Sequence, residues 1–147
     1  MKKLKSTYKI IPDLNLVIEF HTGILDVDTY IDFKKKLFSD KLFKPEMNFF
    51  IHHKNVVFST TPADIKKFVD FIHSKSEVLG KRKVAMVTFT PNQVVSTTLY
   101  KKQQTNLNQE AEVFSTNESA LSWLLTEPYS EKEIISIIRN LKNSLDN

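Results

Sequence analysis

Five hydroxyl or amide side chains stand where two predicted strands give way to helices. They are Ser59, Thr60, Thr61, Thr90 and Asn92. A helix N-terminus has free backbone N–H groups and a partial positive charge, so these side chains could frame a bound anion or carry a phosphate. A simpler role is capping, with Thr61 before Pro62 and Thr90 before Pro91. Both roles stay open, and Ser59 is the better candidate for a regulatory phosphosite because capping already explains Thr61.

The four histidines do not have the spacing of a metal site. They are His21, His52, His53 and His73. His52 and His53 are neighbours in a predicted strand, so their side chains point to opposite faces and cannot easily bind one metal ion. We expect this pair to mark a strand end that meets solvent. No spacing links the other two histidines to them as zinc ligands, and we therefore predict no metal.

The sequence also lacks the marks of common catalytic sites. It has no cysteine, which excludes disulfides and thiolate chemistry. It has only two glycines, so a glycine-rich phosphate loop is absent. A histidine–serine–acid set could be drawn from His53, Ser59 and Asp64, but no nucleophile elbow or oxyanion signature accompanies it. We therefore expect no enzymatic activity and no cofactor.

The composition is that of an ordinary globular protein. The 147 residues are 41% hydrophobic and 26% charged, which predicts a single domain over residues 1–147. The net charge is +4, but the basic residues are nearly all lysines on predicted polar helix faces, such as 34–36. A nucleic-acid partner is therefore not expected. No apolar run suits a signal peptide or a membrane span, so we predict a cytoplasmic protein.

The fold can be predicted outward from a buried strand and the capped helix after it. Residues 48–53 are apolar at neighbouring positions, which predicts a central strand with both faces covered. The polar pair Lys54 and Asn55 should form a turn after it. Beyond Thr61 and Pro62, apolar residues recur with helical spacing. These are Ile65, Phe68, Val69 and Ile72.

Other strands and helices alternate with this unit. Residues 16–21 alternate between apolar and polar side chains, which predicts a half-exposed strand antiparallel to the first one. The predicted strands are 8–11, 16–21, 48–53, 84–89 and 111–114. Right-handed crossovers that step in one direction place their helices together. We therefore predict an α/β fold: a mixed sheet of four to five strands with helices mainly on one face.

An extra amphipathic helix is predicted at about 131–145. Its apolar stripe consists of Ile134, Ile138, Leu141 and Leu145. The stripe could pack back on the domain's own sheet or neighbouring helix. It could also form an interface with a partner, for which a second copy of this chain is the first candidate.

Two motifs carry a resemblance to a known family. Val113 and Phe114 end a strand, and a helix with the sequence Ala-Leu-Ser-Trp-Leu follows at 120–124. The buried strand 84–89 leads at once into another helix. In this order, residues 8–125 resemble the SpoIIAA-like branch of the STAS superfamily, the anti-sigma-factor-antagonist fold. The helix at 131–145 lies outside the resemblance.

The resemblance implies a non-enzymatic module that binds another protein. In such proteins a serine in an Asp-Ser-Ser-Gly-like motif is phosphorylated at the start of the helix after the central strand. The matching stretch here, 58–62, has the hydroxyls but neither the aspartate nor the glycine. Our first prediction is a STAS-like protein-interaction or regulatory module. The alternative is a domain that binds a small anionic or apolar ligand at the helix N-termini. An apolar cavity beside those residues would favour the alternative, and a filled core the first prediction.

Overall fold

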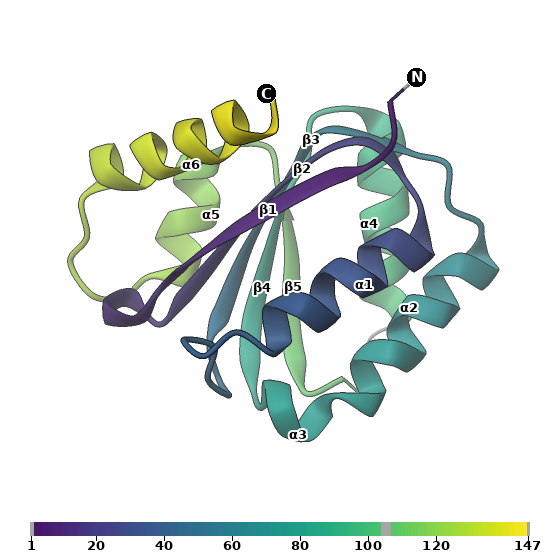
Figure 1. The fold of residues 1–147 in the computed structure, drawn as a ribbon, viewed down its shortest axis with the longest axis horizontal. Coiled ribbons are helices and arrows are strands. Elements are labelled where there is room, and N and C mark those ends of the chain that lie inside the picture. Colours follow the sequence, from purple (N-terminus) through teal and green to yellow (C-terminus); the bar gives the residue numbers. More distant parts are fainter. Residues whose placement is uncertain (1, 104–106, 147) are drawn as a thin grey trace.

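A five-stranded sheet lies at the centre of the molecule (Figure 1). The computed structural model describes residues 2–103 and 107–146, so residues 1, 104–106 and 147 of the predicted domain lie outside the described ones. The strands, in their order across the sheet, are β1 (Lys5–Ile11), β2 (Leu16–Leu25), β3 (Asn48–Phe58), β4 (Arg82–Val87) and β5 (Gln109–Phe114). β1 is antiparallel to β2, and the other neighbours are parallel. The mixed sheet and its antiparallel first pair are confirmed.

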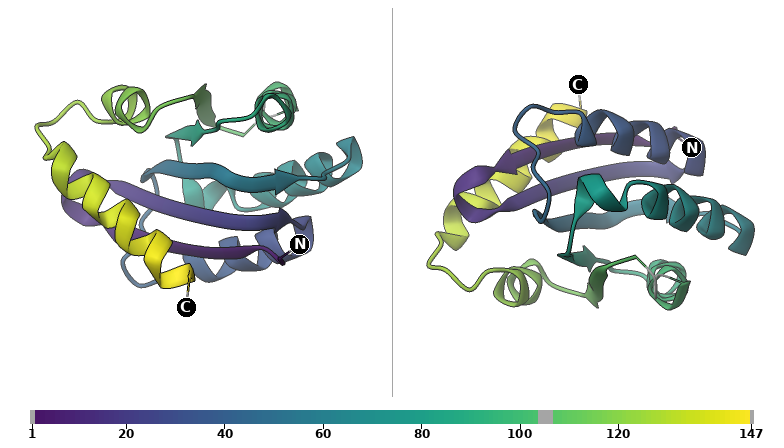
Figure 2. Two further views of the ribbon diagram at one scale, coloured as in Figure 1. Left: turned by 90° about the horizontal axis from the view of Figure 1, so that it is seen from above. Right: turned by 90° about the horizontal axis from the view of Figure 1, so that it is seen from below.

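Helices cover both faces of this sheet (Figures 1 and 2). On one face lie α1 (Val27–Phe38), α2 (Pro62–Ser74), the short α3 (Ser76–Leu79) and α4 (Pro91–Gln103). On the other lie α5 (Asn117–Leu124) and α6 (Glu131–Leu145), and the turn η1 (Pro12–Leu14) joins β1 to β2. Helices α1, α2 and α4 are crossovers between parallel strands, which keeps them together as predicted. Helix α5 follows the last strand and is not a crossover, so the crossover rule does not require it to lie on the same face as α1, α2 and α4.

The cap predicted for α2 is present. The Thr61 hydroxyl accepts a hydrogen bond from the Asp64 N–H at 3.2 Å, and the Asp64 carboxylate accepts one from the Thr61 N–H at 2.9 Å. Pro62 is the first helical residue. This reciprocal pair satisfies two backbone donors and fixes where α2 leaves the sheet. The position of α2 matters because this helix forms the roof of the cavity described below.

Two predictions about strands were wrong. The turn expected at Lys54 and Asn55 does not form, because β3 continues to Phe58 beside a lengthened β2. A register shift between Phe20 and Thr22 accommodates the extra residue in β3. The strand at 84–89 ends earlier, at Val87, and Phe89 is 76% exposed.

β2 was also predicted to be half-exposed, and this was wrong. Glu19 and His21 are completely buried. They face the layer that contains α1, whose Lys34 reaches down to Glu19. A charged partner inside the core therefore replaces the solvent that the alternating pattern suggested.

Candidate functional site

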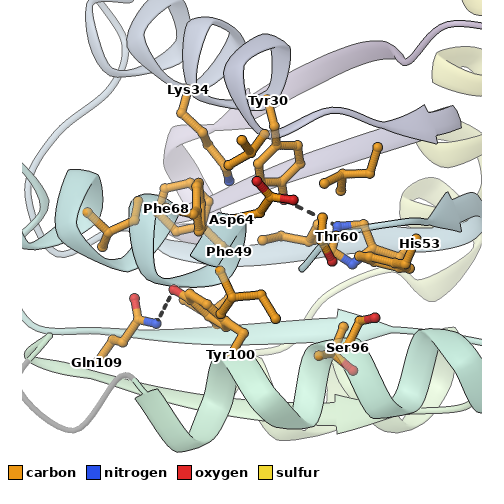
Figure 3. A pocket seen from close by; sticks show the side chains of 18 of the residues that line it. Tyr30, Lys34, Phe49, His53, Thr60, Asp64, Phe68, Ser96, Tyr100 and Gln109 are labelled. Atoms are coloured by element: carbon orange, nitrogen blue, oxygen red, sulfur yellow. Dashed lines mark hydrogen bonds between the residues drawn. The ribbon is translucent and has the colours of Figure 1, made fainter. Parts of the chain in front are cut away.

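A cavity lies between the sheet and the helices α1, α2 and α4 (Figure 3). Its volume is about 80 Å³. β3 contributes Phe49, Ile51 and His53, which point to this face because alternate strand residues share a face. Most of the other lining side chains are aliphatic or aromatic. A mostly apolar lining with a few polar groups is typical of pockets for small molecules.

Aromatic rings hold the roof above the sheet. The Phe68 ring of α2 lies 5.1 Å from the Tyr30 ring of α1 and 5.6 Å from the Tyr100 ring of α4, measured between centroids. These three side chains join the helices to one another over β3. Because these large rings contact one another, they hold α2 away from the sheet and leave a gap beneath it. Smaller side chains would allow α2 to pack closer to the sheet.

One end of the cavity has the uncharged polar side chains of His53, Tyr30 and Thr60, and the Asp64 carboxylate at the start of α2 also lines the cavity (Figure 3). His53 is 4% exposed, and its Nε2 lies 3.2 Å from the Tyr30 hydroxyl. Burial lowers the pKa of His53 well below its usual value, with help from nearby His21 and Lys34, so the ring is neutral at pH 7. Within the described part of the chain, the buried atoms His53 Nδ1 and Thr60 Oγ1 have no hydrogen-bond partner. Both residues line the cavity.

The other end has a buried cation. Arg82 is 5% exposed and donates hydrogen bonds to the Gly80 carbonyl at 2.9 Å and to the Gln109 side-chain oxygen. The Gln109 amide donates in turn to the Tyr100 hydroxyl at 2.7 Å. Burial lowers the pKa of Arg82 to about 10, so the guanidinium stays charged at pH 7. No ion pair between Arg82 and a carboxylate occurs among the residues described.

A polar network lies beside the cavity. Lys34 of α1 donates to one oxygen of Glu19, and the other oxygen lies 2.8 Å from His21 Nε2. His21 Nδ1 lies 2.6 Å from the Ser6 hydroxyl. Burial disfavours the charged carboxylate, but Lys34 and His21 together hold the pKa of Glu19 below its usual value. Burial lowers the pKa of His21, against the pull of Glu19.

This network has the order hydroxyl, imidazole, carboxylate, but its surroundings do not suit nucleophilic catalysis. Ser6 and His21 do not line the cavity, so a substrate held there would not reach the hydroxyl. The Glu19 charge is already taken by Lys34. The network positions α1 over β2, and only Lys34 among its members lines the cavity.

The five predicted site residues do not converge. Ser59 is exposed, and its role as a phosphosite stays a prediction. Thr61 caps α2, and Thr90 caps α4 by accepting from the Gln93 N–H at 3.2 Å. Asn92 donates to the Phe58 carbonyl at 3.1 Å. Of the five, only Thr60 lines the cavity.

The prediction that His52 and His53 point to opposite faces is confirmed, but the prediction that they meet solvent was wrong. His52 and His53 do point to opposite faces, and His52 stacks on Phe20 with the centroids 4.5 Å apart. Both rings are buried rather than solvent-exposed, since β3 does not end at them. The sequence prediction also missed Lys34, although it stands four residues after Tyr30 and three before Leu37. That spacing puts Lys34 on the buried stripe of α1.

The apolar stripe of α6 packs on the domain itself. Ile134 and Ile138 are buried with β2, β3 and α5, and Leu141 and Leu145 pack against the same cluster. The stripe therefore packs back on the domain, which was the first of the two predicted roles, and it is not a free interface. Its burial follows from the position of α6 against β1 and β2.

Two comparisons with known proteins gave no match: no family model and no curated protein matches this chain. Among solved structures, the chain is similar to an uncharacterized protein from Shewanella loihica, of the DUF3478 family and with a SpoIIAA-like fold. The sequence identity is 15% and the TM-score 0.55, over 82% of this chain and 93% of the other. The chain has a SpoIIAA-like fold. This confirms the predicted architecture. A fold does not by itself determine a function, which depends on the site.

Two further findings concern the described residues, 2–103 and 107–146. None of their helices is long and apolar enough to cross a membrane. Their His, Asp and Glu side chains do not gather in a group of three that could hold a metal ion.

Proposed function

We propose that this domain binds a small, mostly apolar molecule in the cavity beneath α2 and performs no chemistry on it. The observation that carries this proposal is the neutral end of the cavity. There, His53 Nδ1 and Thr60 Oγ1 are buried beside an apolar space, and neither has a hydrogen-bond partner among the residues that the structure describes. A buried polar atom without a hydrogen bond costs about 1–3 kcal/mol, which a ligand with a matching polar group would offset.

The cavity supports a binding role by the criterion that followed from the sequence. A filled core would have favoured the protein-interaction prediction, and an apolar cavity beside the helix N-termini favours the ligand-binding one. The cavity adjoins Thr60, directly before the cap of α2. The ligand would lie between the parallel strands and their crossover helices.

A binding role is favoured over catalysis because the reactive groups are occupied or isolated. Glu19 and Lys34 satisfy each other. His53 is neutral, and its one hydrogen-bond partner in the described chain is the Tyr30 hydroxyl, whose pKa is raised well above its usual value by burial. Asp64 also lines the cavity, but its carboxylate accepts from the Thr61 N–H, and in the described chain it makes no hydrogen bond or ion pair with His53 that would form an acid–base pair.

A fluorescent probe can test this proposal. The neutral dye N-phenylnaphthylamine should brighten when it enters the cavity of the wild-type protein. Ser96→Trp places a large ring into the cavity from α4 and should abolish the signal. Val95→Trp is the matched control, because Val95 is 57% exposed on the same helix and does not line the cavity.

The proposal fails if the wild-type protein leaves the dye dark. It also fails if Ser96→Trp, shown to be folded by circular dichroism, binds the dye as well as Val95→Trp does. Either result would mean that the space beneath α2 does not take up an apolar molecule.

The protein-interaction prediction remains a second candidate, favoured by a strip of exposed apolar side chains. The strip consists of Phe89 before α4 and Val94, Val95 and Leu99 on it. The partner we consider is a second copy of this chain. Light scattering over a range of concentrations should then show a dimer that Val95→Asp disperses, and a monomer at every concentration would remove this candidate.

A further inference from the structure

We infer that the ligand is an anionic amphiphile whose carboxylate pairs with Arg82, at the end of the cavity away from His53 and Thr60. This inference rests on the proposed function and specifies the class of molecule bound. The class is a monocarboxylic acid with an extended apolar body and a neutral polar group at its far end, such as a long-chain hydroxy fatty acid. Three observations carry it: the charge balance, the free donors and the length of the site.

The buried charges beside the cavity do not balance. Among the buried charges, Lys34 and Arg82 are positive, and Glu19, which Lys34 contacts directly, is negative. Asp64 also lines the cavity, but it is not buried, and its carboxylate accepts a hydrogen bond from the Thr61 N–H at the start of α2. The two acceptors that Arg82 reaches, the Gly80 carbonyl and the Gln109 side-chain oxygen, are both neutral. An unpaired buried charge is costly, and an anion beside it would offset that cost.

Donors remain for such an anion. A guanidinium has five N–H groups, and Arg82 makes two side-chain hydrogen bonds within the described chain, to Gly80 and Gln109. The Tyr100 hydroxyl accepts from the Gln109 amide, and in the described part of the chain its own O–H does not donate. A carboxylate has two oxygens and accepts well from a guanidinium and a phenol together. Arg82 and Tyr100 both line the cavity.

The distance between the two ends suits an extended molecule. Val84 pairs with Phe49, so Arg82 stands level with Met47, six residues before His53 along β3. Six strand residues correspond to roughly 20 Å. Apolar side chains such as Phe49, Ile51 and Val84 line the space between the two ends. An acyl chain would run along them, and a neutral polar group at its far end would meet the unpartnered atoms of His53 and Thr60.

The experiment compares two ligands that differ only in the head group. Palmitic acid and hexadecanol share one chain, and their affinities can be measured by displacement of N-phenylnaphthylamine. The wild-type protein should bind the acid roughly tenfold or more tightly than the alcohol, as expected for a charge-assisted pair. Arg82→Met should abolish this preference and leave the affinity for the alcohol nearly unchanged. Arg82→Lys should retain most of it, and Lys81→Gln, at the exposed neighbouring position, should retain all of it.

A fourth variant keeps the inference testable if Arg82→Met does not fold. Tyr100→Phe keeps the ring and removes only the hydroxyl, and it should reduce the preference for the acid severalfold. Equal affinity of the wild-type protein for acid and alcohol would overturn the inference and leave the proposed function standing. An undiminished preference in folded Arg82→Met would overturn it too. Failure of both molecules and of the dye to bind would instead refute the proposed function.

Discussion

The two faces of the sheet are built from the same strands but have opposite characters. The face under α5 and α6 is packed with hydrocarbon, including Leu16, Ile18 and Phe50. The face under α1, α2 and α4 contains the buried ion pair, two of the buried histidines and the cavity. Because strand residues alternate between faces, each strand can supply stability to one face and polar function to the other. The neighbours His52 and His53 show this division, since they lie on opposite faces.

The largest expected effect concerns the ion pair on the cavity face. Lys34→Met should reduce the free energy of unfolding by about 3–5 kcal/mol, because it leaves the Glu19 carboxylate buried without its cation. Urea denaturation measures this loss. The exposed pair of Lys66 with Asp70 provides the control, and Lys66→Met should cost less than about 0.5 kcal/mol. Adding Glu19→Gln to Lys34→Met should restore much of the stability; two independent, additive losses would contradict the pairing.

A matched pair of isoleucines compares how well the two faces are filled. Ile134→Ala on α6 should cost about 3–4 kcal/mol, because it opens a hole in a packed cluster. Ile65→Ala on α2 should cost about 2 kcal/mol, since Ile65 already borders empty space and loses fewer contacts. Chemical denaturation of both variants tests the difference. Equal losses would mean that the cavity face is packed as tightly as the other.

Acid should weaken the protein through its buried histidines. Burial lowers the pKa of His52 to about 4, from 6.5 in the unfolded chain. Between these values the unfolded chain binds more protons than the folded one. The stability is therefore fully present above about pH 6.5 and falls as the pH falls toward 4. For His52 alone, the loss from pH 7 to pH 5 should be about 2 kcal/mol.

A variant isolates that contribution. His52→Phe keeps a ring stacked on Phe20 and should remove this share of the pH dependence in denaturation curves. His53, whose pKa is also lowered, titrates on the cavity face and should leave a slope of the same sign. An unchanged slope in His52→Phe would show that His52 does not titrate in this range.

The smallest expected effect compares two helix caps. Thr61→Ala at α2 and Ser130→Ala at α6 should each cost about 1 kcal/mol, because each hydroxyl accepts a hydrogen bond from a free backbone N–H. Thermal melting measures both losses. Only Thr61→Ala should also weaken binding of N-phenylnaphthylamine, since α2 roofs the cavity and α6 packs on the opposite face. If both variants weakened dye binding equally, dye binding would not depend on the position of α2.

Local features of the fold could be predicted from the sequence because neighbouring residues determine them. The cap at Thr61 and the crossover position of α1, α2 and α4 follow from residue types and from the order of the elements. The site was predicted less well. Thr60 was identified, but Lys34 was wrongly assigned to a polar helix face, and Arg82 was not identified. A lysine looks the same in a sequence whether solvent or a buried Glu19 neutralises it.

The sequence by itself determined the alternating strands and helices, their caps and the SpoIIAA-like order. The tertiary structure alone decided that β3 continues past His53, that α5 and α6 cover the second face, and that rings on three helices hold a cavity open. The physical reason is the distance along the chain over which each interaction acts. Capping and periodicity act over a few residues, whereas the partner of Glu19, the isolation of Arg82 and the gap beneath Phe68 depend on segments that meet only after folding.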